Sequence, residues 1–198
     1  MKYLKSLVLA TMSTLLMGLA VAGTATATEL TCNGSLCPIG TVLHGEAVGK
    51  IVLDAPFGNV ECNATSEGNV TSPGSATTTP TGKTTFTQYS NCGSDTVHVL
   101  KAGSGETHTT GAGNNGNGII TSTGTEVTIV HLGFHCIFST SNTSVGEFTG
   151  SNNTGGTARF DIKATIPRTG GSSGAFCGSS APMTGSVIMT NPDNLVIH

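Results

Sequence analysis

The sequence of 198 residues has no tryptophan, only two tyrosines and few charges, since 10% of its residues are Asp, Glu, Lys or Arg. Eight basic and eleven acidic residues give a formal net charge of −3. A protein that binds nucleic acid through a basic face needs an excess of Lys and Arg, so this composition excludes that class. After residue 27, no apolar stretch approaches the roughly 20 residues of a membrane-spanning helix.

The first 27 residues have the layout of an export signal. Lys2 and Lys5 precede an apolar stretch, and Ala25-Thr26-Ala27 fits the small-x-small cleavage rule. We therefore expect residues 1–27 to be a signal peptide and the rest of the chain to be secreted, to the extracellular space, the periplasm or the cell surface. A retained membrane anchor is disfavoured because hydroxyl side chains interrupt the apolar stretch and leave it too short.

Six cysteines follow the expected signal, namely Cys32, Cys37, Cys62, Cys92, Cys136 and Cys177. An even number in an exported chain indicates three disulfides, although the count alone leaves the pairing open. We favour Cys32–Cys37, which encloses a turn-forming tetrapeptide, and Cys62–Cys92 and Cys136–Cys177, which would each join neighbouring strand regions. Zinc binding is disfavoured because the sequence contains no Cys-x-x-Cys pair and no finger or ribbon spacing.

About half of residues 28–198 are Gly, Thr, Ser or Asn, which are poor helix formers. Short β-prone runs separated by turn residues predict strands at Lys50–Asp54, Asn59–Ala64, Lys83–Tyr89, Thr96–Lys101, Thr125–Leu132, Phe134–Phe138, Gly146–Thr149, Ala158–Ile166, Gly185–Met189 and Leu195–His198. The clearest alternation is that of Phe160, Ile162, Ala164 and Ile166 with polar residues, which predicts a strand with one buried face.

These features predict an all-β fold, a single antiparallel β-sandwich with a barrel as the second choice. We expect long loops rich in Gly, Ser, Thr and Asn over residues 72–82, 103–118, 139–157 and 169–180. The expected organisation is a signal peptide over residues 1–27, an N-terminal segment with the Cys32/Cys37 loop over 28–49, and the β-sandwich domain over 50–198.

Three patterns match catalytic or metal-binding motifs, but none has the context that the chemistry requires. Gly111–Gly116 fits the dinucleotide pattern without a helix after it, and Gly170–Gly174 fits the nucleophile-elbow pattern without an α/β sheet around it, although Asp193 and His198 follow. His131 and His135 could form a metal pair on one strand, but Gly133 between them favours a break in the alternation. We therefore predict no enzyme, cofactor or metal site.

Several short motifs resemble those of the secreted bacterial activators of alkane oxidation, the PraB-type family. They are Val60-Glu61-Cys62, Tyr89-Ser90-Asn91-Cys92, Phe134-His135-Cys136-Ile137-Phe138, Ala175-Phe176-Cys177-Gly178, Met183-Thr184-Gly185-Ser186 and Asn191-Pro192-Asp193-Asn194-Leu195. The similarity covers most of residues 50–198, whereas the Cys32/Cys37 loop has no counterpart. The resemblance implies an extracellular accessory factor that helps cells use poorly soluble hydrocarbon, and it supplies no catalytic residues.

The sequence thus leads to a non-enzymatic secreted protein that acts at the cell surface or at a hydrocarbon–water interface. Its partner would be a hydrophobic surface or a cell-surface component, and self-association is compatible with this role. The alternative is a structural or adhesive extracellular subunit of the biofilm-matrix or fimbrial type, assembled by strand exchange. A hydrolase with an unrecognised site is the least favoured hypothesis.

Overall fold

The computed structural model describes residues 29–75, 77–109, 116–171 and 174–198, and the expected signal peptide lies outside them. The secondary structure of this part consists of β1 (Leu30–Cys32), β2 (Ser35–Leu36), β3 (Val42–Ala47), β4 (Ile51–Ala55), β5 (Gly58–Ser72), β6 (Thr81–Ser90), β7 (Thr96–Lys101), β8 (Ser104–Thr109), β9 (Asn117–Thr123), β10 (Glu126–His131), β11 (Phe134–Ser139), β12 (Thr143–Thr149), α2 (Ser151–Thr154), β13 (Arg159–Gly171), α3 (Gly174–Cys177), β14 (Ser180–Asn191) and β15 (Leu195–Ile197). Among these residues, no helix is long and apolar enough to cross a membrane.

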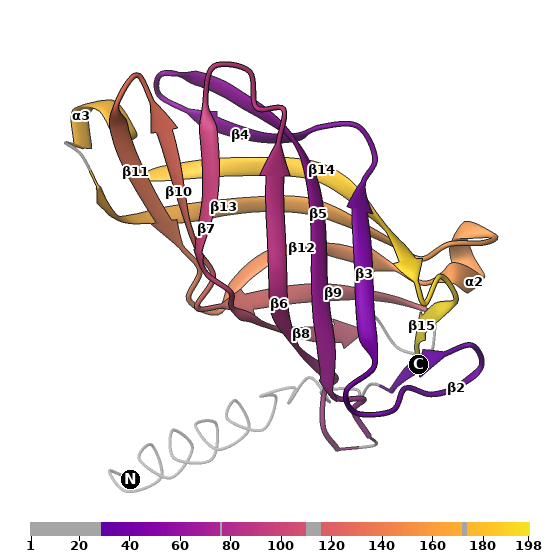
Figure 1. Ribbon diagram of the computed structural model, residues 1–198. Coiled ribbons are helices and arrows are strands. Elements are labelled where there is room, and N and C mark those ends of the chain that lie inside the picture. Colours follow the sequence, from indigo (N-terminus) through magenta and orange to yellow (C-terminus); the bar gives the residue numbers. More distant parts are fainter. Residues whose placement is uncertain (1–28, 76, 110–115, 172–173) are drawn as a thin grey trace, which may run out of the picture.

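The large antiparallel sheet curls until its ends meet. Hydrogen-bonded pairing runs in the order β3-β5-β6-β8-β9-β12-β13-β14, and β14 pairs again with β3. In Figure 1, β3, β5 and β6 cross in front of β13 and β14. The ring is only partly closed, because β6 and β8 pair over no more than Thr81–Lys83 with Ser104–Glu106. We call this arrangement the ring.

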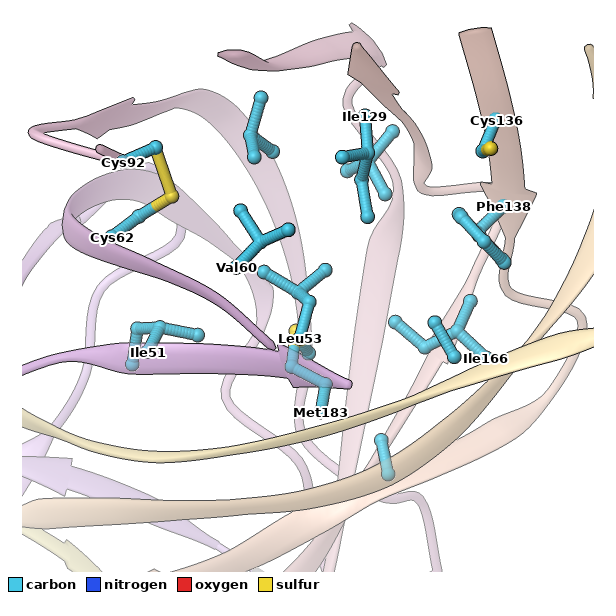
Figure 2. Close-up of a cluster of buried hydrophobic side chains, with 14 of the residues drawn as sticks. Ile51, Leu53, Val60, Cys62, Cys92, Ile129, Cys136, Phe138, Ile166 and Met183 are labelled. Carbon is cyan, nitrogen blue, oxygen red and sulfur yellow. A yellow bond between two sulfur atoms is a disulfide. The ribbon is translucent and has the colours of Figure 1, made fainter. Parts of the chain in front are cut away.

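One end of the ring is built like a sandwich. Strands β7, β10 and β11 extend the sheet from the end of β13, and they pack over β4 and the first half of β5. Figure 2 shows buried side chains from both layers meeting in the main core, including Ile51, Leu53, Val60, Ile129, Phe138, Ile166 and Met183. The other end holds a smaller core around Phe148, Ala158 and Ile197, next to the three-stranded sheet β15-β1-β2.

Three disulfides join Cys32 to Cys37, Cys62 to Cys92 and Cys136 to Cys177. The favoured pairing is therefore confirmed. The two long-range bonds belong to the main core, where Cys62, Cys136 and Cys177 have no more than 1% of their surface exposed. Figure 2 shows the Cys62–Cys92 bond, which ties β5 to the segment that follows β6.

The predicted all-β antiparallel fold is confirmed, and so is the alternation along β13. Ala164 and Ile166 are buried, and Phe160 and Ile162 pack against the same core. The loops predicted from the sequence were too long, because strands form within some of them. Strands β8, β9 and β12 form within residues 103–118 and 139–157 or at their borders, and β3, in the segment before residue 50, pairs with β5 and β14.

Candidate ligand-binding cavity

The ring surrounds a cavity of about 320 Å³. Its size is at the lower end of the roughly 300–1,000 Å³ of small-molecule sites. Its walls come from strands all around the ring and from the start of the sandwich end, including Phe138 of β11. The exposed residues Lys83 and Ser104 also line it, so the cavity reaches the surface where β6 and β8 separate.

One arc of the wall is entirely apolar. Strands β12, β13, β14, β3 and β4 contribute Leu43, Gly45, Ile51, Val145, Phe160, Ile162, Ile166, Met183, Val187 and Met189. On β13, inward apolar residues alternate with polar outward ones, as the period of two predicts. Phe160, Ile162 and Val187 are only half-buried although they face inward, because they border the cavity.

The opposite arc carries hydroxyl groups, and five of them bond to one another in two clusters. From β5 and β6, Ser66 and Thr87 lie with their hydroxyl oxygens 3.0 Å apart. Beside them, the Ser122 hydroxyl is 3.0 Å from those of Thr125 and Thr140, and the Thr140 oxygen also accepts the backbone N–H of Thr125. These bonds satisfy five of the hydroxyl groups within the wall, and the cavity combines an apolar side with a neutral polar side.

Tyr89 lies where the hydroxyl arc meets the main core. It faces inward beside Ala64, its partner across β5 and β6, and packs against the core cluster. Atoms surround Tyr89 closely, yet it is only half-buried by accessible surface, because that surface borders the cavity. Burial raises the pKa of its hydroxyl above the usual value. Within the described part of the chain, this hydroxyl makes no hydrogen bond.

We expect Tyr89 of the folded protein to ionise at a higher pH than a tyrosine in the unfolded chain, whose pKa is about 10. Because the folded pKa is raised, the stability that this group contributes is complete below about pH 10 and is lost as the pH rises through the folded pKa. Tyr89 is the only tyrosine after residue 27, so phenolate absorbance of a protein that comprises residues 28–198 reports on it alone. Coincident titration curves for the native and the denatured protein would contradict this prediction.

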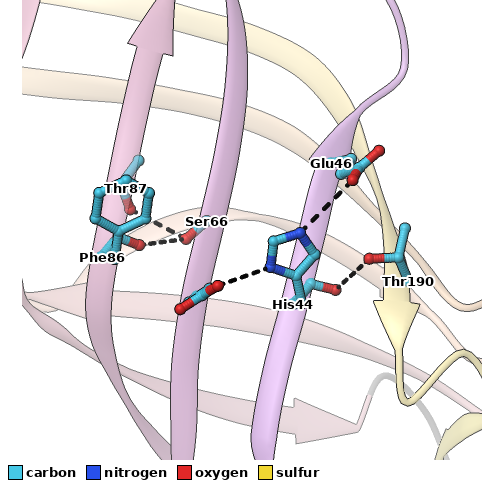
Figure 3. Close-up of polar contacts among 7 residues, drawn as sticks. His44, Glu46, Ser66, Phe86, Thr87 and Thr190 are labelled. Carbon is cyan, nitrogen blue, oxygen red and sulfur yellow. Dashed lines mark hydrogen bonds and ion pairs between the residues drawn. The ribbon is translucent and has the colours of Figure 1, made fainter.

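The charged groups near the cavity belong to the outer surface. Of the lining residues, only Glu67 and Lys83 carry charge, and both are exposed. Glu67 Oε1 lies 3.2 Å from His44 Nδ1, and Glu46 Oε1 lies 3.6 Å from His44 Nε2. Figure 3 shows His44 on β3 with these contacts on both sides of its ring. The Glu67 carboxylate is therefore engaged outside the ring, and the cavity itself is neutral.

His131 and His135, in the hairpin formed by β10 and β11, do not form a metal pair. His131 ends β10 and His135 lies in β11, and the register pairs them with Phe134 and Val130, which places them on opposite faces. His131 Nδ1 is 2.6 Å from Asp95 Oδ1, and its ring stacks on Phe57. Among the described residues, no group of three or more His, Cys, Asp or Glu could hold a metal ion.

The two glycine-rich motifs fall largely outside the part that can be described. Residues 110–115 include most of the dinucleotide-like pattern, and Ser172 of the elbow-like pattern is likewise outside. Of the residues that follow the elbow-like pattern, Asp193 accepts the backbone N–H of Ala158 through its own backbone oxygen, and His198 Nε2 lies 3.0 Å from Thr31 Oγ1.

Sequence reasoning did not identify the cavity or Tyr89. The alternation in β13 indicated which side chains face inward, but not that a space remains between them. The signal that could have found Tyr89 is its isolation, because it is the only tyrosine of residues 28–198, which also lack tryptophan. The fold and the site together define an antiparallel β-protein with an internal, mainly apolar cavity. Comparisons with family models, with curated proteins and with solved structures find no match.

Proposed function

We propose that this protein is a secreted, non-enzymatic accessory factor that takes up small apolar molecules in its ring, at the cell surface or at a hydrocarbon–water interface. The observation that carries the proposal is the cavity of about 320 Å³, with one wholly apolar arc and access to the surface. Apolar cavities of this kind bind ligands mainly by removing apolar surface from water.

Two further features support this role. Three disulfides suit an oxidising compartment outside the cytoplasm. At the hairpin end of the molecule, Leu132 is 82% exposed and Phe176 is 46% exposed, and Phe176 stacks on Phe134 with ring centroids 4.1 Å apart. These side chains offer contact to an apolar phase. The alternative role in strand exchange has less support, because each strand of the ring has a hydrogen-bonded neighbour on both sides over at least part of its length.

Filling the cavity tests the proposal. Ala64 is half-buried, lines the cavity and faces Tyr89 across the strand pair, so Ala64→Leu places a larger apolar side chain in the ligand space. We expect this variant to bind decane about tenfold more weakly or worse, which corresponds to a loss of about 1.4 kcal/mol or more. Binding is measured by displacement of a fluorescent apolar dye from the exported protein.

Gln88→Leu is the matched control. Gln88 neighbours Tyr89 on β6 but is exposed on the outer face, so the same apolar side chain is added outside the ring. This variant should bind decane as the original protein does. Equal binding by both variants would show that the probe sits on the surface, and no binding by the original protein would refute uptake into the ring.

A further inference from the structure

The cavity has two chemically different sides, which can contact different parts of a ligand. The arc from β12 through β14 to β3 and β4 presents only apolar atoms, whereas β5, β6, β8 and β9 bring hydroxyl groups to the other side. A pure hydrocarbon could pack against the apolar arc. At the hydroxyl-bearing arc it would displace water without replacing the hydrogen bonds that the water makes there. The polar side is therefore the part of the cavity that can distinguish one apolar ligand from another.

Within the polar side, Tyr89 has hydrogen-bonding capacity to spare. The hydroxyls of Ser66 and Thr87 are paired, and those of Ser122, Thr125 and Thr140 form a second cluster. The hydroxyls of Tyr89, Thr84, Ser104 and Thr107 have no partner among the described residues, and of these four side chains Tyr89 is the one that packs against the main core. Because Tyr89 borders the cavity and its hydroxyl has no protein partner, that hydroxyl can both donate and accept a hydrogen bond with a ligand in the cavity.

Charge in the ligand is disfavoured. The cavity holds no cation for an anionic headgroup, because the exposed Lys83 lies at the rim and the Glu67 carboxylate is turned to His44 on the outer face. A carboxylate placed in the ring would lose its hydration without gaining an ion pair, which is expensive in an apolar site.

We propose that the preferred ligand is a neutral chain molecule with a single hydroxyl or carbonyl group, which hydrogen-bonds to the Tyr89 hydroxyl while the chain lies along the apolar arc. This inference rests on the proposed function, because it assumes that the ring takes up a ligand. Tyr89 then acts as the residue that determines specificity, and the apolar arc supplies the larger share of the affinity.

The experiment compares decane, decanol and decanoate on the exported protein and on Tyr89→Phe, by displacement of the same apolar dye. Tyr89→Phe removes one oxygen and keeps the aromatic ring, so we expect roughly two- to tenfold weaker binding of decanol, the range that one neutral hydrogen bond provides, and no loss of decane binding, because decane makes no hydrogen bond to the hydroxyl. Decanoate at neutral pH should bind more weakly than decanol to both proteins. Circular dichroism and thermal unfolding verify that the variant keeps the fold.

The outcomes separate this inference from the proposed function. If decane and decanol bind and Tyr89→Phe affects both equally or neither, the role of Tyr89 is refuted while uptake into the ring stands. Tighter binding of decanoate than of decanol would refute the neutral-ligand part. If none of the three probes binds to the original protein, the proposed function itself fails. A red shift of the tyrosine absorbance with decanol, absent with decane, gives a second readout, for which Tyr89→Phe is the blank.

Discussion

Replacing Cys62 and Cys92 together with alanine is expected to lower the free energy of unfolding by about 3 to 4 kcal/mol. The disulfide closes a loop with a sequence separation of 30 residues, and its removal lets the unfolded chain explore many more conformations. Both sulfurs also lie in the main core, so the alanines leave space between β5 and the segment after β6. The loss should be measured by chemical denaturation of the protein at neutral pH.

The pair Cys32 and Cys37 is the matched control within the same chain. Its sequence separation is only 5, so the chain-entropy effect of removing it is smaller, about 2 kcal/mol. If both double variants lost the same stability, loop closure would not be the reason that the long-range bond matters. An unchanged free energy of unfolding after removal of the Cys62–Cys92 bond would contradict the prediction outright.

Phe138→Ala is expected to cost about 3 to 5 kcal/mol, the range for emptying a fully buried aromatic position. Phe138 has no exposed surface, belongs to the main core and pairs across the hairpin with Val127. Phe138 also lines the cavity, so the space left by its phenyl group would merge with the existing cavity instead of being refilled by neighbouring side chains. Thermal and chemical unfolding of the purified variant measure the loss.

Phe86→Ala provides the comparison on the surface. Phe86 is 48% exposed on the outside of β6, and its removal should change stability by no more than about 0.5 kcal/mol. Equal losses for Phe86→Ala and Phe138→Ala would mean that the sandwich end does not contain the core described here. The contrast separates general sensitivity to the loss of a phenylalanine from the cost of opening the main core.

The sequence was most informative where side chains alternate sharply. Phe160, Ile162, Ala164 and Ile166 all face inward as expected, because polar neighbours on β13 leave only one way to bury them. Strand β8, with the sequence Ser104–Thr109, gave no such signal. Ser104, Gly105 and Thr107 border the cavity and not a packed core, so the strand forms without an apolar face, through pairing with β6 and β9.

The cavity could not be predicted for a different reason. Its lining combines residues as far apart in sequence as Leu43 and Met189, and which of them meet depends on the closing contacts of β3 with β5 and β14. Local pattern assigns a residue to a face but does not fix the distance between opposite walls. The disulfide pairing could be predicted from the sequence, because Cys32 and Cys37 enclose a short turn and the other two pairs join regions that were expected to be neighbouring strands.

Closure of the ring by pairing of β14 with β3 also constrains the order in which the strands can fold. A chain that emerges from its N-terminal end first can form the β4–β5 and β5–β6 hairpins early, because their contacts are local. Strand β3 can pair with β14 only after residues 180–191 have been synthesised, and β1 can pair with β15 only after the C-terminal residues have been synthesised. The last strands therefore complete the sheets that the first strands begin, so the fold can be completed only after nearly the whole chain has been synthesised.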